Sequence, residues 1–293
     1  MRLSVLDTSP IVQGSTPREA LRDTADLAEL AEELGFHRYW VPEHHGMRGV
    51  ASSAPAVLVA HLASITSRLR VGSGGVLLPN HPPLVVAEQF GTLAALHPGR
   101  IDLGVGRAPG GAPSVVSALR RSDQPYRAQL LELQSLLTPA STVAVPVMDV
   151  PDLWLLGSSP GTSALASELG VPLAFARHLN PGVSCAADLV SVAVICAEDD
   201  ERAEWLAGPI RTKVRSRREG TRILLPPPNG LEPLPDDGRV LVGGPAAITQ
   251  KLQAVLEETG TSELMITSPI YHHADRRRSY ELVAGIAGEL RAG

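Results

Sequence analysis

Short apolar segments alternate with longer amphipathic segments along the whole chain, and this alternation is the feature that most limits the possible folds. Eight apolar segments have the length and the Val, Leu and Ile content of buried strands. They are residues 2–7, 37–41, 69–77, 101–105, 153–156, 173–175, 189–196 and 264–267. Strands that alternate with helices form a parallel sheet, and eight such units in 293 residues favour closure into an α/β fold of the (β/α)8, or TIM barrel, type. We find no linker, so residues 1–293 are predicted to form a single domain.

The amphipathic segments between the strands predict the covering helices. The expected helices are residues 17–34, 54–66, 83–96, 127–137, 161–169, 199–207, 245–258 and a last one ending near 291. The first helix carries a capping box in Thr16 and Glu19, with Pro17 at its first position. Residues 177–188 are short and rich in helix breakers, so one covering helix is expected to be missing between strands six and seven. Residues 224–238, rich in Pro and Gly, are predicted to be a loop.

Composition and charge exclude several classes of protein. The formal net charge of −5 disfavours a nucleic-acid partner, so the basic residues 211–218 and 276–278 are interpreted as solvated helix faces. No segment approaches the roughly 20 apolar residues that span a bilayer, and the N-terminus lacks a signal-peptide pattern. We therefore expect a cytoplasmic protein without a membrane partner. Cys185 and Cys196 are too few for a disulfide framework or a structural zinc site, and are predicted to be buried, inert thiols.

Polar residues follow the predicted strands, which in such a barrel places them at one end. The turn from Gly157 to Ser163 opens a helix, and its backbone N–H groups with the hydroxyls of Ser158, Ser159 and Thr162 suit an anionic phosphate. Arg107, one strand away, supplies a counter-charge. The alternative is an ordinary helix capped by Ser or Thr.

Two histidines follow the second strand. His44 and His45 titrate near neutrality and can transfer a proton or bind a polar oxygen, although one of them is expected only to order the loop. No metal site is predicted, because the E-H-H pattern lacks the spacing of H-E-x-x-H, and His81 or His178 could add a ligand only through the fold.

The third strand contains closely spaced glycines. Gly74 and Gly75 permit close approach of the backbone to a flat ligand, or else reflect crowding in the barrel.

With these residues in view, the chain resembles the bacterial luciferase-like family of flavin monooxygenases. The resemblance rests on YWVPEHH (39–45), on residues 69–89 and 97–107, on WLLGSS (154–159) and on residues 263–283, which sample nearly the whole length in the same order. The family fold is a (β/α)8 barrel that is commonly a homodimer. The family reduces oxygen to a flavin C4a-hydroperoxide, which attacks the substrate.

The resemblance also implies roles for residues of this chain. Reduced FMN would bind at the rim, with its phosphate near Arg107, Gly157, Ser158, Ser159 and Thr162 and with a cis peptide at Gly74–Gly75 beneath its ring. His44 stands where luciferases carry their catalytic histidine, and the substrate-pocket candidates are His45, Asn80 and His178.

The chain departs from the family at Gly106, where luciferases carry a reactive cysteine, and at two short connections, those after strands four and six. The predicted function is an FMNH2- and O2-dependent monooxygenase of a hydrophobic substrate, polyketide-like or an aldehyde. A separate flavin reductase is expected as partner, because the chain has no NAD(P)H fingerprint. The alternatives are an F420-dependent hydride-transfer enzyme and a non-catalytic flavin-binding protein.

Overall fold

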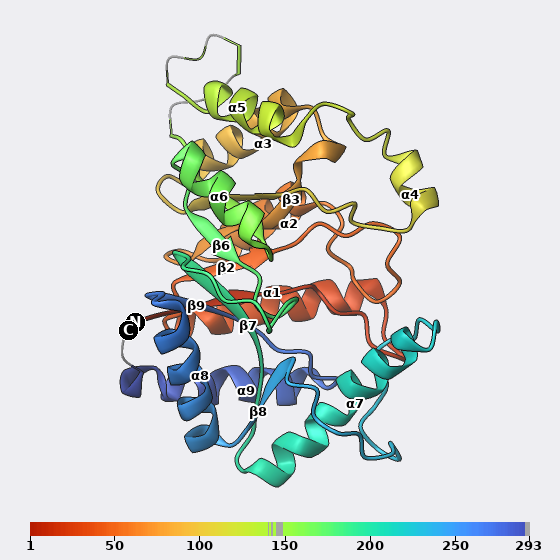
Figure 1. The fold of residues 1–293 in the computed structure, drawn as a ribbon. Helices are drawn as coiled ribbons and strands as arrows, with labels where there is room; N and C mark the ends of the chain where they lie inside the picture. The colour runs from red at the N-terminus through yellow and green to blue at the C-terminus, as the bar shows by residue number, and fades with distance from the viewer. Residues whose placement is uncertain (140, 142, 145–148, 291–293) are drawn as a thin grey trace.

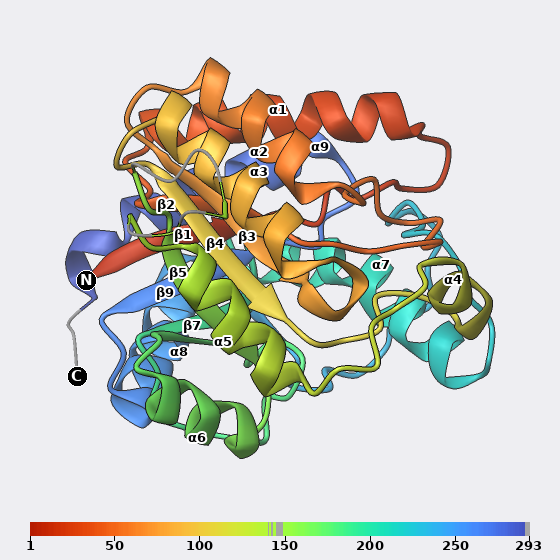
Figure 2. The ribbon, with the colours of Figure 1, turned by 90° about the horizontal axis from the view of Figure 1, so that it is seen from above.

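A closed barrel of eight parallel strands forms the centre of the computed structural model, which describes residues 1–139, 141, 143–144 and 149–290 (Figures 1 and 2). The barrel strands are β1 (Arg2–Leu6), β2 (Arg38–Val41), β3 (Arg70–Leu77), β4 (Ile101–Gly106), β5 (Asp152–Gly157), β6 (Leu173–Phe175), β7 (Leu189–Cys196) and β9 (Glu263–Thr267). Neighbours pair in that order, and the β7–β9 and β1–β9 pairings close the ring. All eight expected strands and the (β/α)8 architecture are confirmed.

Helices cover the outside of the barrel. They are α1 (Pro17–Glu33), α2 (Pro55–Ile65), α3 (Pro83–Leu96), α5 (Tyr126–Leu136), α6 (Pro160–Leu169), α8 (Pro245–Thr259) and α9 (His273–Gly285). The capping box is confirmed, since Glu19 N–H donates to Thr16 Oγ1 and Thr16 N–H donates to the Glu19 carboxylate. Residues 176–188, all of which are described, form turns without a helix, so the expected gap in the helical layer is also confirmed.

Short elements that the sequence did not predict lie between the barrel units. They are the 3-10 turns η1 (Leu78–Asn80) and η2 (Ala287–Glu289), helix α4 (Pro113–Ala118) and strand β8 (Val240–Gly243). Elements of three to six residues carry too little periodicity to be recognised in a sequence.

An additional helix and strand pack beside the carboxyl-terminal half of β7. Helix α7 (Asp200–Arg218) and β8 both pack on β7, and β8 pairs only with its carboxyl-terminal half, Ala193–Cys196. Helix α8 then covers the outside of the barrel before β9. This helix and strand therefore lie at the carboxyl end of the strands, which we call the barrel mouth (Figure 1). The sequence predicted a helix ending at residue 207, but α7 continues to Arg218 with Pro209 in its interior, where proline normally disfavours a helix.

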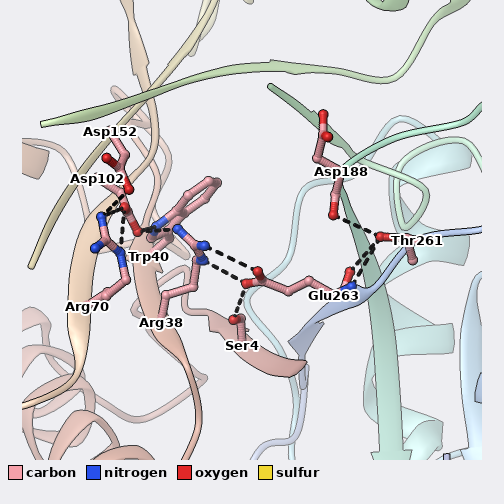
Figure 3. A network of polar contacts seen from close by, with 9 residues as sticks. All are labelled: Ser4, Arg38, Trp40, Arg70, Asp102, Asp152, Asp188, Thr261 and Glu263. Carbon is pink, nitrogen blue, oxygen red and sulfur yellow. Dashed lines mark hydrogen bonds and ion pairs between the residues drawn. The ribbon is translucent and has the colours of Figure 1, made fainter. Parts of the chain in front are cut away.

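Buried ion pairs fill the opposite, amino-terminal end of the barrel (Figure 3). Arg38 Nη1 lies 2.8 Å from Asp102 Oδ2, and Arg38 Nε lies 2.7 Å from Glu263 Oε1. Asp102 is also paired with Arg70, and Ser4 Oγ donates to Glu263. Because each buried charge has a partner of opposite sign, these polar side chains can replace an apolar core at this end.

The expectation that residues 276–278 form a solvated helix face was wrong for one of the three. Arg276 is 3% exposed, and its Nη2 lies 2.9 Å from the buried Asp7 carboxylate. Arg277 and Arg278 pair with the more exposed Asp26 and Glu198. Successive helical residues point about 100° apart, so one of three neighbours faces the barrel.

The two cysteines are both free thiols. Cys185 is half-buried and Cys196 is buried. Burial raises the pKa of both, that of Cys196 to about 11, which leaves them protonated and unreactive near neutral pH. In the part of the chain that the structure describes, no helix is both long and apolar enough to cross a membrane.

Candidate active site

Arg107 and the serines predicted to bind a phosphate lie at the ends of adjacent strands. Strands β4 and β5 pair in parallel, with Val105 opposite Leu155, so Arg107 and Ser158 follow them at the same edge of the barrel. The Arg107 side chain is exposed. Nearby, the buried Tyr126 hydroxyl has no hydrogen-bond partner among the described residues; burial raises its pKa, and the charge of Arg107 opposes that rise.

The turn between β5 and α6 is tightly packed on itself. Thr162 N–H donates to Ser159 O at 3.0 Å, and the hydroxyls of these two residues lie 3.3 Å apart. A Cβ on Gly157 would lie 2.3 Å from Thr162 Oγ1, so a larger residue at 157 would displace Thr162. Ser159 occupies the cap position of α6, but its side chain makes no capping bond. The alternative of an ordinary Ser-capped helix is therefore disfavoured.

The peptide bond between Gly74 and Gly75 is cis, as the resemblance implies. A Cβ on Gly74 would lie 2.8 Å from Leu6 Cδ1, and one on Gly75 would lie 2.6 Å from Gly104 O. Crowding within the barrel is thus sufficient to require glycine at both positions. Contact of this bond with a ligand remains a prediction.

Glu43 forms the centre of a hydrogen-bonded cluster at the mouth. Its buried carboxylate accepts hydrogen bonds from His45 Nε2 at 2.7 Å, from His81 Nε2 at 2.9 Å and from Asn80 Nδ2 at 3.1 Å. It also accepts one from Leu77 N–H at 2.9 Å. Burial alone would raise the pKa of Glu43, but the bonds from the two histidines and Leu77 lower it to about 2. The carboxylate is therefore charged and joins the loop after β2 to the turn after β3.

This cluster changes the interpretation of two candidate pocket residues. His45 and Asn80 were predicted to face the substrate, and their donor atoms point to Glu43 instead. Asn80 Oδ1 is buried without a partner among the described residues. The central residue, Glu43, was not among the predicted site residues, although an acidic residue directly after a buried strand and before two histidines was a usable signal.

His44 differs from its neighbour. Its backbone N–H donates to Ser52 O, and its buried Nδ1 has no partner among the described residues. Burial lowers its pKa, the nearby His45 lowers it further, and Glu43 opposes them. At neutral pH the imidazole is therefore uncharged and can accept or share a proton.

His178, at the end of β6, lies within electrostatic reach of His44. Its Nδ1 lies 2.7 Å from Ser191 Oγ. Burial lowers its pKa to about 4; hydrogen bonding with the Ser191 backbone opposes this shift and the charge of His44 adds to it. A group with this pKa stays neutral, so His178 is suited to hydrogen bonding rather than to proton transfer at pH 7.

Several buried polar atoms near the mouth have no hydrogen-bond partner among the described residues. Among the described residues, no group of three or more His, Cys, Asp or Glu side chains is arranged to hold a metal ion. The unpartnered polar atoms of His44, Asn80 and Tyr126 are donors or acceptors that a ligand could satisfy. Arg107 and the β5–α6 turn lie at the same edge of the barrel.

Comparison with known proteins identifies close relatives along nearly the whole chain. A family model described as luciferase-like monooxygenase matches residues 1–263. An Escherichia coli (strain K12) protein named luciferase-like monooxygenase is 40% identical over 326 residues, covering 98% of this chain and 97% of that protein. A Bacillus subtilis (strain 168) N-acetyl-S-alkylcysteine monooxygenase is 31% identical, with 97% of each chain covered. The crystal structure of apo-MsnO8 superposes with a TM-score of 0.91 at 37% identity, covering 100% of this chain and 98% of that one.

More distant structures share the fold alone. The oxygenating constituent of 3,6-diketocamphane monooxygenase, in complex with FMN, has a TM-score of 0.77 at 18% identity, covering 100% of this chain and 99% of that one. A coenzyme F420-dependent reductase from Methanopyrus kandleri has a TM-score of 0.65 at 13% identity, covering 97% and 98%. The E. coli alignment extends over 326 positions against 293 residues here, so this chain is shorter than that relative at internal positions.

Proposed function

The chain belongs to the luciferase-like monooxygenase family, and we propose that it oxygenates a hydrophobic organic substrate with reduced FMN and O2. The observation that carries the proposal is the convergence of two groups at one mouth. Arg107 and the β5–α6 turn suit a phosphate, and the uncharged His44 presents a free Nδ1. A phosphate-bearing flavin held by the first group would place its ring within the barrel mouth, where the second group lies.

The overall reaction balances with the flavin as the reductant. FMNH2, O2 and the substrate give FMN, water and a product that contains one added oxygen atom. Reduced FMN, when bound, would supply the two electrons that activate oxygen. The residues of this chain would bind the phosphate through Arg107, Ser158, Ser159 and Thr162, and would exclude water from the mouth.

His44 is the proposed catalytic residue. Because its imidazole is uncharged at neutral pH and its Nδ1 has no partner in the described structure, it can hold a proton for a reacting oxygen. Glu43 orients the neighbouring loops through His45 and His81, and so fixes the backbone that carries His44.

The substrate is proposed to be polyketide-like or an aldehyde. The name of the 31% identical B. subtilis relative adds a third candidate, a thioether such as an S-alkylcysteine derivative.

Two partners are part of the proposal. A separate reductase would supply FMNH2, because the sequence has no NAD(P)H fingerprint. A homodimer would cover the apolar outer faces of α2 and α3, where Val57 is 72% exposed and Leu96 is 66% exposed. Analytical ultracentrifugation tests the dimer: the wild type should sediment as a dimer and Val57→Glu as a monomer, whereas a monomeric wild type would contradict it.

Anaerobic FMNH2 binding followed by rapid mixing with oxygen tests the main proposal. We expect FMNH2 to bind, and oxygenated product to form from a candidate thioether or aldehyde when a flavin reductase is present. Loss of product in His44→Ala, with FMN binding retained, would exclude a merely flavin-binding protein. Tight binding of F420 together with failure to bind FMNH2 would instead support the hydride-transfer alternative.

A further inference from the structure

Lys213 lies where three segments meet at the barrel mouth. It is on α7, which borders the mouth across from α4 (Figures 1 and 2). A Cβ on Gly49 would lie 3.5 Å from Lys213 Nζ, and the same point lies 3.5 Å from Leu224 Cδ2 and 3.8 Å from Ile11 O. Residues 11 and 49 belong to the loops after β1 and β2, and residue 224 belongs to the connection between α7 and β8.

Backbone hydrogen bonds join these segments around the lysine. Ile11 N–H donates to Gly49 O at 3.1 Å, and Gln13 N–H donates to Leu225 O at 2.9 Å. Gly49 lies in the loop after β2 that also includes His44 and His45, so the ammonium lies beside the loop that carries the proposed catalytic residue.

Lys213 makes no ion pair or hydrogen bond within the described residues, unlike most basic residues of its helix. The paired ones are Arg202 with Asp275, Arg211 with Glu204, Arg215 with Glu232, and Arg218 with Asp237. The chain has only two lysines, and the other, Lys251, donates to Val242 O at 2.6 Å. Lys213 is thus the one lysine without an evident structural partner in the described structure.

An ammonium in this position is poorly stabilised by the protein alone. Its side chain is half-buried, burial lowers its pKa, and the nearby Arg217 lowers it further. A charged group that is partly removed from water without a counter-charge is disfavoured. An anion that enters from the mouth would stabilise the charged ammonium of Lys213.

We propose that Lys213 binds a carboxylate carried by the organic substrate. The inference rests on the proposed function and narrows its substrate class to hydrophobic acids. A lysine is a compact point charge on a flexible stem, which suits a singly charged group, whereas a phosphate or sulfonate favours the bidentate donors of arginine.

The anion bound by Lys213 is distinct from the flavin phosphate. The predicted phosphate site follows β4 and β5, whereas Lys213 lies beside the loops after β1 and β2. In a ring of eight strands, β1 and β5 are on opposite sides. A substrate acid at Lys213 would therefore leave the apolar part of the molecule directed toward the centre of the mouth.

The two lysines make a direct binding test possible. Reductive 13C-dimethylation of the FMN-saturated protein gives one NMR signal for each lysine and one for the N-terminal amine, and Lys213→Met identifies the signal of Lys213. Addition of octanoate should shift the Lys213 signal saturably and leave the Lys251 signal in place. Octanamide, which has the same chain without the charge, should have no effect. An unchanged Lys213 signal, a shift that does not saturate or an equal response to octanamide would overturn the proposal, and would indicate a lysine whose ammonium only reaches solvent.

Calorimetry with the unlabelled protein supplies matched controls. Octanoate should bind at least 10-fold more weakly to Lys213→Met than to the wild type. Lys213→Arg should retain most of the affinity, and Arg217→Met, an exposed cation one turn away, should match the wild type. Equal losses in Lys213→Met and Arg217→Met would contradict a specific site. Because these assays detect binding of the acid, failure of oxygenation would refute the proposed function without affecting this result.

Discussion

His81 Nε2 lies 2.9 Å from each carboxylate oxygen of Glu43, which joins the turn after β3 to the end of β2. His45 Nε2 approaches the same carboxylate at 2.7 Å. A single buried charge therefore holds two loops of the mouth. The position of His44, one residue from Glu43, depends on this arrangement.

Replacement of Glu43 by Gln should make the free energy of unfolding less sensitive to acidic pH. The pKa of Glu43 is lowered from 4.5 to about 2, so its charge stabilises the fold above pH 4.5 and the contribution is lost as pH falls from 4.5 toward 2. Urea unfolding at pH 6 should show the wild type more stable than Glu43→Gln by about 2–3 kcal/mol. That difference should narrow by about 1–2 kcal/mol at pH 3.5. A difference that stays constant with pH would show that the carboxylate is not the stabilising group.

The pH dependence of oxygenation should report His44. Burial keeps its pKa below 6.5, so the neutral form should persist, and the acidic limb of the rate profile should be half-maximal below pH 6.5. Glu43→Gln should move this limb to still lower pH, because the charge of Glu43 raises the His44 pKa. His44→Ala should lose turnover while FMN affinity stays within twofold. A limb at the same pH in the wild type and Glu43→Gln would mean that another group titrates.

The fold could be predicted from the sequence because its signals are local and repeated. Each barrel strand is a short apolar segment, and each covering helix has its own amphipathic pattern, as with the capping box of Thr16. The region after β7 was predicted poorly because its structure depends on packing and not on a local sequence pattern. The helix expected to end at residue 207 continues to Arg218, and the four residues of β8 become a strand only because β7 extends beyond its neighbours to pair with them.

The sequence predicted which strand ends carry the candidate site residues, but not the hydrogen bonds and ion pairs between them. Position at the end of a strand was sufficient to bring Arg107 and Ser158 to one edge of the barrel. The carboxylate of Glu43 takes its partners from residues up to 38 positions away, and Arg276 pairs with Asp7 across most of the chain. Such pairings are determined by the packing of the folded chain, and the spacing of residues along the sequence does not predict them.

The two glycines of the β5–α6 turn offer a matched test of the phosphate-binding turn. A Cβ on Gly157 would lie within 2.5 Å of three Thr162 atoms, whereas one on Gly161 would meet only Ser159 Oγ at 4.0 Å. Gly157→Ala should therefore weaken FMN binding by at least about 10-fold, or about 1.4 kcal/mol. Gly161→Ala should bind FMN as the wild type does, by fluorescence quenching. Equal affinities in the two variants would remove the Thr162 hydroxyl from the site.

The ion pairs at the amino-terminal end of the barrel should dominate stability without affecting flavin affinity. Arg38 is 4% exposed and lies between Asp102 and Glu263, so Arg38→Met leaves the buried Glu263 without its cation and leaves Asp102 with Arg70 alone. We expect a loss of about 3–5 kcal/mol in the free energy of unfolding. Arg278→Met, which removes an exposed pair with Glu198, should change it far less. Similar losses in both variants would show that the buried network is not the source of stability.

The role assigned to Arg107 is separable from general electrostatics by comparing FMN with riboflavin, which lacks the phosphate. Arg107 is exposed after β4 and beside the turn that follows β5, so its guanidinium should contact the phosphate and not the ring. Arg107→Ala should weaken anaerobic FMNH2 binding by roughly 1.5–3 kcal/mol, the range for a hydrogen bond to a charged group. Riboflavin affinity should stay unchanged. Arg120→Ala, which removes an exposed arginine of the same connection, controls for net charge and should bind both flavins normally. If Arg107→Ala weakens the binding of riboflavin and of FMN equally, the guanidinium does not contact the phosphate, and the phosphate site lies elsewhere on the rim.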